Sequence, residues 1–245
     1  MRVISRLLPF VALIAFTAWP VPVHAAARAE GHWEGKIQIP DHELRIAVDL
    51  AQTATGAWVG SLSIAGSSAT DVPLIKITVS SEGVQFTASL PGETSFVGTL
   101  STDASSLAGK VSNAEGAVPF QLARTGEANV KLPPPSSPSS KEFEGEWQGT
   151  VDVGGKVMRL VLKVSAAPDG TAKATVTNLD KGNVEIPATT VTIQGRQLEL
   201  QMRVIGGSYR GTLGSGGEIA GELAQQSVKM PVTFTRVASP PQPLK

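Results

Sequence analysis

Cysteine is absent from the 245 residues, so the chain can form no disulfide bond and its N-terminus cannot be a lipoprotein signal. Histidine occurs only three times and tyrosine once, which leaves few of the side chains that most often act as general bases or metal ligands. The chain also lacks a Gly-x-Ser-x-Gly elbow and a Ser-x-x-Lys motif. We therefore expect no catalytic residues and predict that the protein is not an enzyme.

A surplus of either charge is also missing. The full chain has 21 basic and 21 acidic residues, and removal of Arg2 and Arg6 with an N-terminal signal would leave 19 basic residues and a charge of about −2. Lysine and arginine form no stripe along the sequence. Nucleic acid and anionic membrane surfaces both require clustered basic residues, so neither is expected as a partner.

The N-terminus has the pattern of a secretory signal peptide. Arg2 and Arg6 precede an apolar run from Leu7 to Trp19, and small residues around Ala25 follow. A membrane anchor is the rival interpretation, but the run is shorter than the roughly 20 apolar residues of a spanning helix. We predict a signal peptide over residues 1–25 and a periplasmic or secreted bacterial protein with no stable membrane anchor after cleavage.

The remaining sequence contains an internal repeat, which is the main clue to its architecture. At an offset of 114 residues, seven positions recur as Gly31/Gly145, Trp33/Trp147, Gly35/Gly149, Arg45/Arg159, Gly56/Gly170, Pro73/Pro187 and Thr78/Thr192. Further matches continue to Arg124 and Arg236 at offsets of 113 and 112. We predict one domain over residues 30–126, a second over 143–238 and a disordered tail over 239–245.

The segment between the repeats, residues 127–142, is rich in proline and serine. Proline favours extended polyproline II structure and serine keeps such a segment solvated, so we predict a semi-rigid linker. A proline-rich recognition motif for a protein partner is the alternative.

Short runs of alternating apolar and polar residues indicate β-strands throughout both repeats, and helical periodicity is absent. In the first repeat the strands are expected near 33–39, 43–50, 56–64, 74–79, 84–90, 95–101, 107–112 and 117–124. Because nearly every connection is short, the predicted fold is all-β, with two tandem, small, eight-stranded up-and-down barrels.

Residues of one parity along each strand share a face. The apolar face of the first repeat contains Trp33, Ile37, Ile39, Leu44, Ile46, Val48, Leu50, Leu62, Ile64, Val84, Phe86, Leu90, Phe96, Leu100, Val111, Val118, Phe120 and Leu122. The opposite parity carries charged residues, among them Asp49 and Arg203, which we expect to face solvent. Each barrel should therefore have an apolar interior.

Arg124 and Arg236 break this pattern because each falls on the inward parity of its last strand. A closed meander places its first and last strands side by side, so each guanidinium is expected to stack on Trp33 or Trp147 and to plug one barrel end. The Gly-x-Trp of the first strand with an arginine of the last resembles the lipocalin-like, or calycin, superfamily. The typical lipocalin is longer than either repeat.

The chain is more closely similar to the β-rich module that precedes the catalytic domain of some bacterial serine hydrolases of the α/β-hydrolase fold. The residues that carry this resemblance are Trp147, Gly149, Arg159, Leu160, Asp180, Gly182, Ile186, Pro187, Tyr209, Gly211, Leu213, Pro231 and Arg236. The hydrolase itself is missing, so the resemblance implies the module and not its activity.

Five residues are candidate ligand contacts: Trp58, Phe86, Met158, Met202 and Tyr209. Trp58 corresponds to an alanine of the second repeat. The smaller alanine side chain either leaves space in the second repeat, or the two methionines fill that space. Tyr209 is either a core residue or a polar contact to ligand.

No cofactor or metal is expected. A site at His32, Asp41, His42 and Glu43 is conceivable, but neighbouring residues of a strand point to opposite faces, and a solvated turn explains them better. The sequence thus predicts a non-catalytic exported binding protein, with a small apolar or lipid-like ligand in the barrel lumen. The alternative is a structural or interaction module that docks to an exported hydrolase or another envelope protein.

Overall fold

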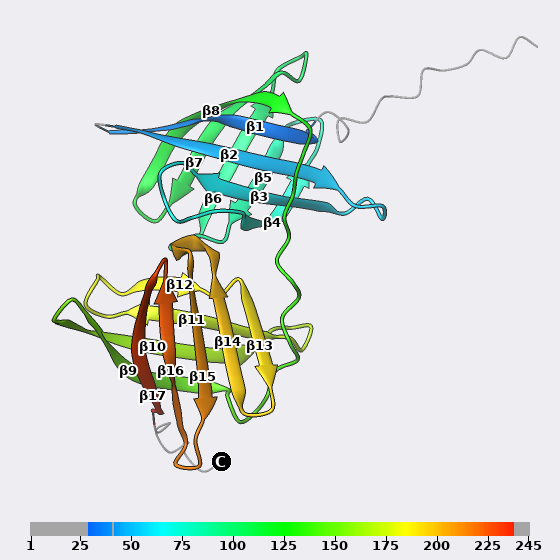
Figure 1. Ribbon diagram of the computed structural model, residues 1–245. Helices are drawn as coiled ribbons and strands as arrows, with labels where there is room; N and C mark the ends of the chain where they lie inside the picture. Colours follow the sequence, from blue (N-terminus) through cyan, green and yellow to red (C-terminus); the bar gives the residue numbers. More distant parts are fainter. Residues whose placement is uncertain (1–28, 41, 238–245) are drawn as a thin grey trace, which may run out of the picture.

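A computed structural model describes residues 29–40 and 42–237, which form antiparallel β-sheets and a short 3-10 helix (Figure 1). The strands of the first sheet are β1 (Gly31–Ile39), β2 (His42–Gln52), β3 (Trp58–Ile64), β4 (Val72–Val79), β5 (Val84–Ala88), β6 (Thr94–Leu100), β7 (Ser106–Asn113) and β8 (Gly116–Gly126). They form a closed barrel in chain order, because β1 pairs with both β2 and β8. The predicted all-β class and the eight-stranded barrel are confirmed for this sheet, which has no open edge.

The second sheet has nine strands and is not closed by strand pairing. They are β9 (Gly145–Val153), β10 (Lys156–Ala166), β11 (Ala172–Asn178), β12 (Val184–Pro187), β13 (Thr190–Gln194), β14 (Gln197–Met202), β15 (Gly207–Leu213), β16 (Glu218–Gln225) and β17 (Val228–Arg236). Their order is β12-β11-β10-β9-β17-β16-β15-β14-β13, so β12 and β13 lie at the two ends of the sheet. The prediction of a second closed eight-stranded barrel is therefore wrong.

The break lies within the fourth strand of the second repeat. In the first sheet one strand, β4, pairs with β3 at its start and with β5 further along. In the second sheet the backbone N–H of Ala188 still donates to the β11 side, at Ala174, whereas the next N–H, of Thr189, donates to Gln201 on β14. The chain changes neighbours between these two residues, directly after Pro187, which has no N–H to donate.

The proline- and serine-rich segment occupies the gap between β11 and β13. The Ser137 N–H donates to the Val191 carbonyl on β13, and the Ser137 carbonyl accepts from the Ala172 N–H on β11. The hydroxyls of Ser136 and Ser137 accept from the backbone N–H groups of Val191 and Ile193. The segment predicted to be a solvated spacer is thus bound along the second sheet, as its course beside β13 in Figure 1 shows.

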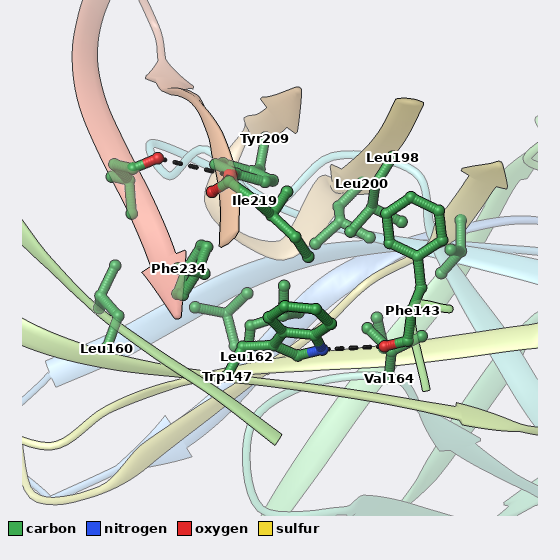
Figure 2. Packing of buried hydrophobic residues seen from close by; sticks show 14 of the residues in the cluster. Phe143, Trp147, Leu160, Leu162, Val164, Leu198, Leu200, Tyr209, Ile219 and Phe234 are labelled. Atoms are coloured by element: carbon green, nitrogen blue, oxygen red, sulfur yellow. Dashed lines mark hydrogen bonds between the residues drawn. The ribbon is translucent and has the colours of Figure 1, made fainter. Parts of the chain in front are cut away.

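Both sheets enclose apolar interiors, as the alternating pattern predicts. On β17, for example, Met230, Val232 and Phe234 are buried while the residues between them are exposed. In the first barrel Phe86 stacks on Phe96, with 4.8 Å between ring centroids. Figure 2 shows the second core, in which Trp147, Leu162, Tyr209 and Phe234 are packed together.

Arg203 does not face solvent as its strand parity suggests. The strand ends at Met202, and Arg203 begins the 3-10 helix η2 (Arg203–Ile205). Its Nη1 donates to the carbonyls of Asp71, in the first repeat, and Lys131, in the linking segment, at 2.7 and 2.6 Å. Arg203 therefore links the second sheet to the first, at the end of the second sheet that faces the first barrel in Figure 1.

The predicted signal peptide over residues 1–25 and the predicted tail over 239–245 lie outside the described residues. Within 29–40 and 42–237, no helix is long and apolar enough to cross a membrane.

Candidate functional site

An arginine stacks on a buried tryptophan at one end of the first barrel. Trp33 on β1 is fully buried and is paired with Arg124 on β8, whose Cζ lies 4.4 Å from the centroid of the indole. The indole N–H donates to the Ala29 carbonyl at 3.0 Å. The guanidinium in turn donates to the carbonyls of Glu30 and Ala104, so its charge is not left without hydrogen bonds.

The second sheet repeats this arrangement. The Arg236 Cζ lies 4.1 Å from the Trp147 ring centroid, and the Trp147 N–H donates to the Phe143 carbonyl at 2.9 Å (Figure 2). The guanidinium donates to the carbonyls of Glu142 and Glu144. At both sites the arginine and the tryptophan are occupied by protein contacts, which indicates a structural plug.

The glycine two positions before each tryptophan leaves room for the arginine. A Cβ at Gly31 would lie 2.6 Å from Arg124 Nη1, and one at Gly145 would lie 2.9 Å from Arg236 Nη1. Both distances are shorter than a Cβ contact allows. The guanidinium could not move aside without disturbing its hydrogen bonds, and both glycines have positive φ angles, +153° and +126°, which other residues rarely adopt. The Gly-x-Trp pattern therefore suits both the backbone and the packing of the plug.

The opposite end of the first barrel contains a cavity of about 420 Å³. Its apolar walls are formed by Ile37, Ile39, Leu44, Ile46, Leu62, Ile64, Leu90, Phe96, Val111 and Val118. Ile46, Leu62 and Phe96 are buried, whereas Ile39, Leu44 and Ile64 are partly exposed, so the cavity deepens from the rim toward the core. A volume and lining of this kind are typical of a small-molecule pocket.

The two candidate contacts of the first repeat lie outside this lining. Trp58 is half-buried at the start of β3, and β3 runs from the plugged end to the cavity, where it ends at Ile64. Phe86 is fully buried and touches the cavity only through its stacked neighbour Phe96. The apolar lining residues belong to the predicted inward face, whereas the polar ones, among them Thr94 and Glu115, were not predicted. The position of the apolar residues near strand ends is the signal that could have distinguished them.

The candidates of the second repeat lie within or beside its core. Met202 is buried and Met158 is partly buried, while the Tyr209 hydroxyl donates to the Ile219 carbonyl at 3.0 Å. Burial raises the pKa of Tyr209 well above its usual value, so the phenol stays neutral and acts as an internal hydrogen-bond donor. Tyr209 is thus placed as a core residue.

The two methionines do not fill the space that corresponds to Trp58. They lie near the start of β10 and the end of β14, whereas Ala172, the equivalent of Trp58, starts β11 at the opposite end of the sheet. Fully buried Phe143 lies at that end, where the first repeat has Ala29. At this end the first repeat therefore has a large residue, Trp58, and a small one, Ala29, whereas the second repeat has the small Ala172 and the large Phe143 at the corresponding positions.

The described histidines lie far apart on the β1–β2 hairpin. His32 Nδ1 lies 2.9 Å from Asp49 Oδ1, and this contact is the main cause of a raised His32 pKa. His42 lies at the other end of the β1–β2 hairpin, because the register pairs His32 with Asp49 and Ile39 with His42. Asp41 lies outside the described residues, and among those described no group of three His, Asp or Glu could hold a metal ion.

Comparisons with known proteins give distant structural similarity only. The chain is similar to a protein of unknown function from the DUF3598 family of Nostoc punctiforme, at 14% identity over 87% of this chain and 98% of that one, with a TM-score of 0.29. It is also similar to a proposed outer membrane protein from Bacteroides fragilis, at 10% identity over 86% and 98%, with a TM-score of 0.27. No protein-family model and no curated protein matches the chain. At these TM-scores the likeness carries no argument about function.

Proposed function

We propose that the chain is a non-catalytic, exported binding protein that takes a small apolar or lipid-like ligand into the open end of its first barrel. The observation that carries this proposal is the 420 Å³ cavity with apolar walls opposite the Trp33/Arg124 plug. Water against apolar walls makes few hydrogen bonds, so its displacement by an apolar ligand lowers the free energy of the complex and favours binding.

Export rests on the N-terminal 25 residues, the tandem arrangement rests on the repeat of about 113 residues, and kinship with lipocalin-like proteins rests on the plug. The second repeat is proposed to act as a filled companion domain. In support, Tyr209 and Phe234 are in edge-to-face contact inside it, with 5.2 Å between ring centroids. The end of the second sheet opposite its Trp147/Arg236 plug faces the first barrel (Figure 1).

Binding of a neutral, apolar fluorophore such as N-phenylnaphthylamine to the full mature chain tests the proposal. We expect saturable enhancement of fluorescence in the wild type and at least a roughly tenfold weaker affinity in Ile64→Trp, because the indole would fill the cavity. Val118→Trp, on a different strand of the same lining, should act in the same way. Thermal melts establish that each variant is folded.

The matched control is Val157→Trp, which adds the same side chain at a position 62% exposed on the second sheet. This variant should bind as the wild type does. Equal binding by the wild type and both cavity variants would contradict the proposal. An absence of saturable binding would instead favour the alternative, a module that docks to an exported hydrolase or another envelope protein. The exposed Val153 and Val157 of the β9–β10 hairpin could provide an apolar contact for that partner.

A further inference from the structure

The charge of the cavity lining restricts the head group of the ligand. Glu115, at the tip of the β7–β8 hairpin, is the one ionisable residue among the described lining residues. Thr94, at the start of β6, adds a half-buried hydroxyl on the same parity as the buried Phe96. The lining therefore offers one anionic group and hydroxyl or amide groups, without a described basic side chain.

The basic residue nearest to the cavity along β1 is directed elsewhere. Lys36 has the opposite parity to the lining residue Ile37, and its ammonium group binds the Glu43 carboxylate on the outer face of β2. It is thus occupied by an ion pair outside the barrel. A carboxylate head group entering the cavity would lose hydration without gaining a cation.

We infer that the cavity takes an amphiphile whose head group is uncharged or cationic, and that it selects against anionic lipids such as fatty acids. This inference rests on the proposed function and names the ligand class of that same site. The apolar tail would lie against Ile46, Leu62 and Phe96, while the head group would remain at the rim near Thr94 and Glu115. There the Glu115 carboxylate attracts an ammonium and repels a carboxylate.

Three ligands with one tail and different head groups test the inference: decylammonium, decanol and decanoate. Each is titrated at neutral pH and low ionic strength into the full mature chain preloaded with N-phenylnaphthylamine. Glu115 is solvent-exposed, so water and salt weaken its effect on the head group to a modest size. We expect decylammonium to displace the probe at about fivefold lower concentration than decanol, and decanoate to be the weakest. Glu115→Gln should remove the advantage of decylammonium over decanol, whereas Glu115→Lys should favour decanoate.

The matched control is Glu82→Gln, which removes an exposed carboxylate from the β4–β5 turn at the plugged end of the same barrel. This variant should keep the wild-type order of affinities. If decanoate binds as tightly as decylammonium, or if Glu115→Gln leaves the order unchanged, the inference is wrong while the proposed function stands. If neither the probe nor any of the three ligands binds, the proposed function itself fails.

Discussion

Arg124 and Arg236 show how far the parity of single residues predicts their environment. A charged residue on an inward position requires a partner, and the pairing of the first strand of each repeat with its last, β1 with β8 and β9 with β17, places Trp33 and Trp147 there. The carbonyl groups that accept from the guanidinium could not be predicted, because they belong to segments outside the strands. The parity of Asp49 predicts that it faces solvent, but the residue is buried. Its carboxylate accepts from the Asn129 N–H, which lies outside the strands, and from His32.

The plug should contribute measurably to stability. Arg236→Ala removes the cation over Trp147 and the hydrogen bonds to the Glu142 and Glu144 carbonyls. We expect the second domain to lose about 1–3 kcal/mol of unfolding free energy, and somewhat less in Arg236→Lys, which keeps the charge but not the planar stack. Urea unfolding of the full chain, followed by the fluorescence of the three tryptophans in residues 29–237, measures this loss.

The control for this variant is Arg210→Ala, because Arg210 is a 73% exposed arginine of the same sheet that pairs with Glu199. Its removal should cost about 0.5 kcal/mol or less, as exposed ion pairs do. If the two alanine variants unfold at the same urea concentration, the plug contributes no stability.

His32 should make the stability of the first barrel depend on pH. The hydrogen bond to Asp49 raises the His32 pKa in the folded state above the ordinary value of about 6.5. The added stability is therefore fully present below that ordinary value and is lost as the pH rises through the folded pKa. Unfolding free energies measured between about pH 6 and pH 8 should fall with rising pH in the wild type but stay flatter in His32→Gln.

His42→Gln is the matched control, because His42 lies at the other end of the same hairpin and is exposed. It should retain the wild-type slope. A slope that His32→Gln leaves unchanged would show that this histidine does not bind Asp49 in solution.

The strands follow from the sequence, whereas the segment that joins the two repeats does not. Alternation places the strands because period two is a local property of the chain. The bonds of residues 134–139 to β11 and β13 depend instead on a gap that opens only when the fourth strand divides after Pro187. Serine and proline indicate a solvated linker in most contexts, so composition alone gave the wrong structure for this segment.

Truncation should reveal the contribution of this segment. A fragment of residues 142–240 lacks the serines that bind β11 and β13, so the N–H groups of Ala172, Val191 and Ile193 lose their acceptors. We expect it to be less stable than a fragment of residues 130–240 by about 2–4 kcal/mol, since several hydrogen bonds are lost together. Thermal or urea unfolding of the two fragments, followed by Trp147 fluorescence, makes the comparison.

A smaller change separates the side-chain contribution. Replacing both Ser136 and Ser137 by alanine in the longer fragment removes two hydroxyl acceptors and should lower its stability. Ser140→Ala, in the same segment but outside the contacts with β13, should have little effect. Equal stability of the two fragments would show that the segment is a spacer after all.

At the scale of the whole molecule, the two repeats have diverged in ways that sequence similarity conceals. The first closes by strand pairing and keeps a cavity at its open end, while the second is completed by the linking segment. Arg203 of the second repeat donates to the carbonyl of Asp71, in the loop between β3 and β4, and a Cβ added at Gly206 would lie 3.0 Å from Ser68 Cβ in the same loop. These contacts join residues that are 132 or more positions apart along the chain, so local patterning could not predict them.

Methyl NMR of residues 26–245, labelled at isoleucine, leucine, valine and methionine and titrated with decanol, tests the central claim most directly. If the first barrel binds the ligand, the methyl resonances of Ile39, Ile64 and Leu90 shift in a saturable manner. Those of Met158 and Met202 in the second sheet stay in place. Shifts centred on the second sheet, or scattered over exposed positions such as Val97 and Val157, would contradict the account.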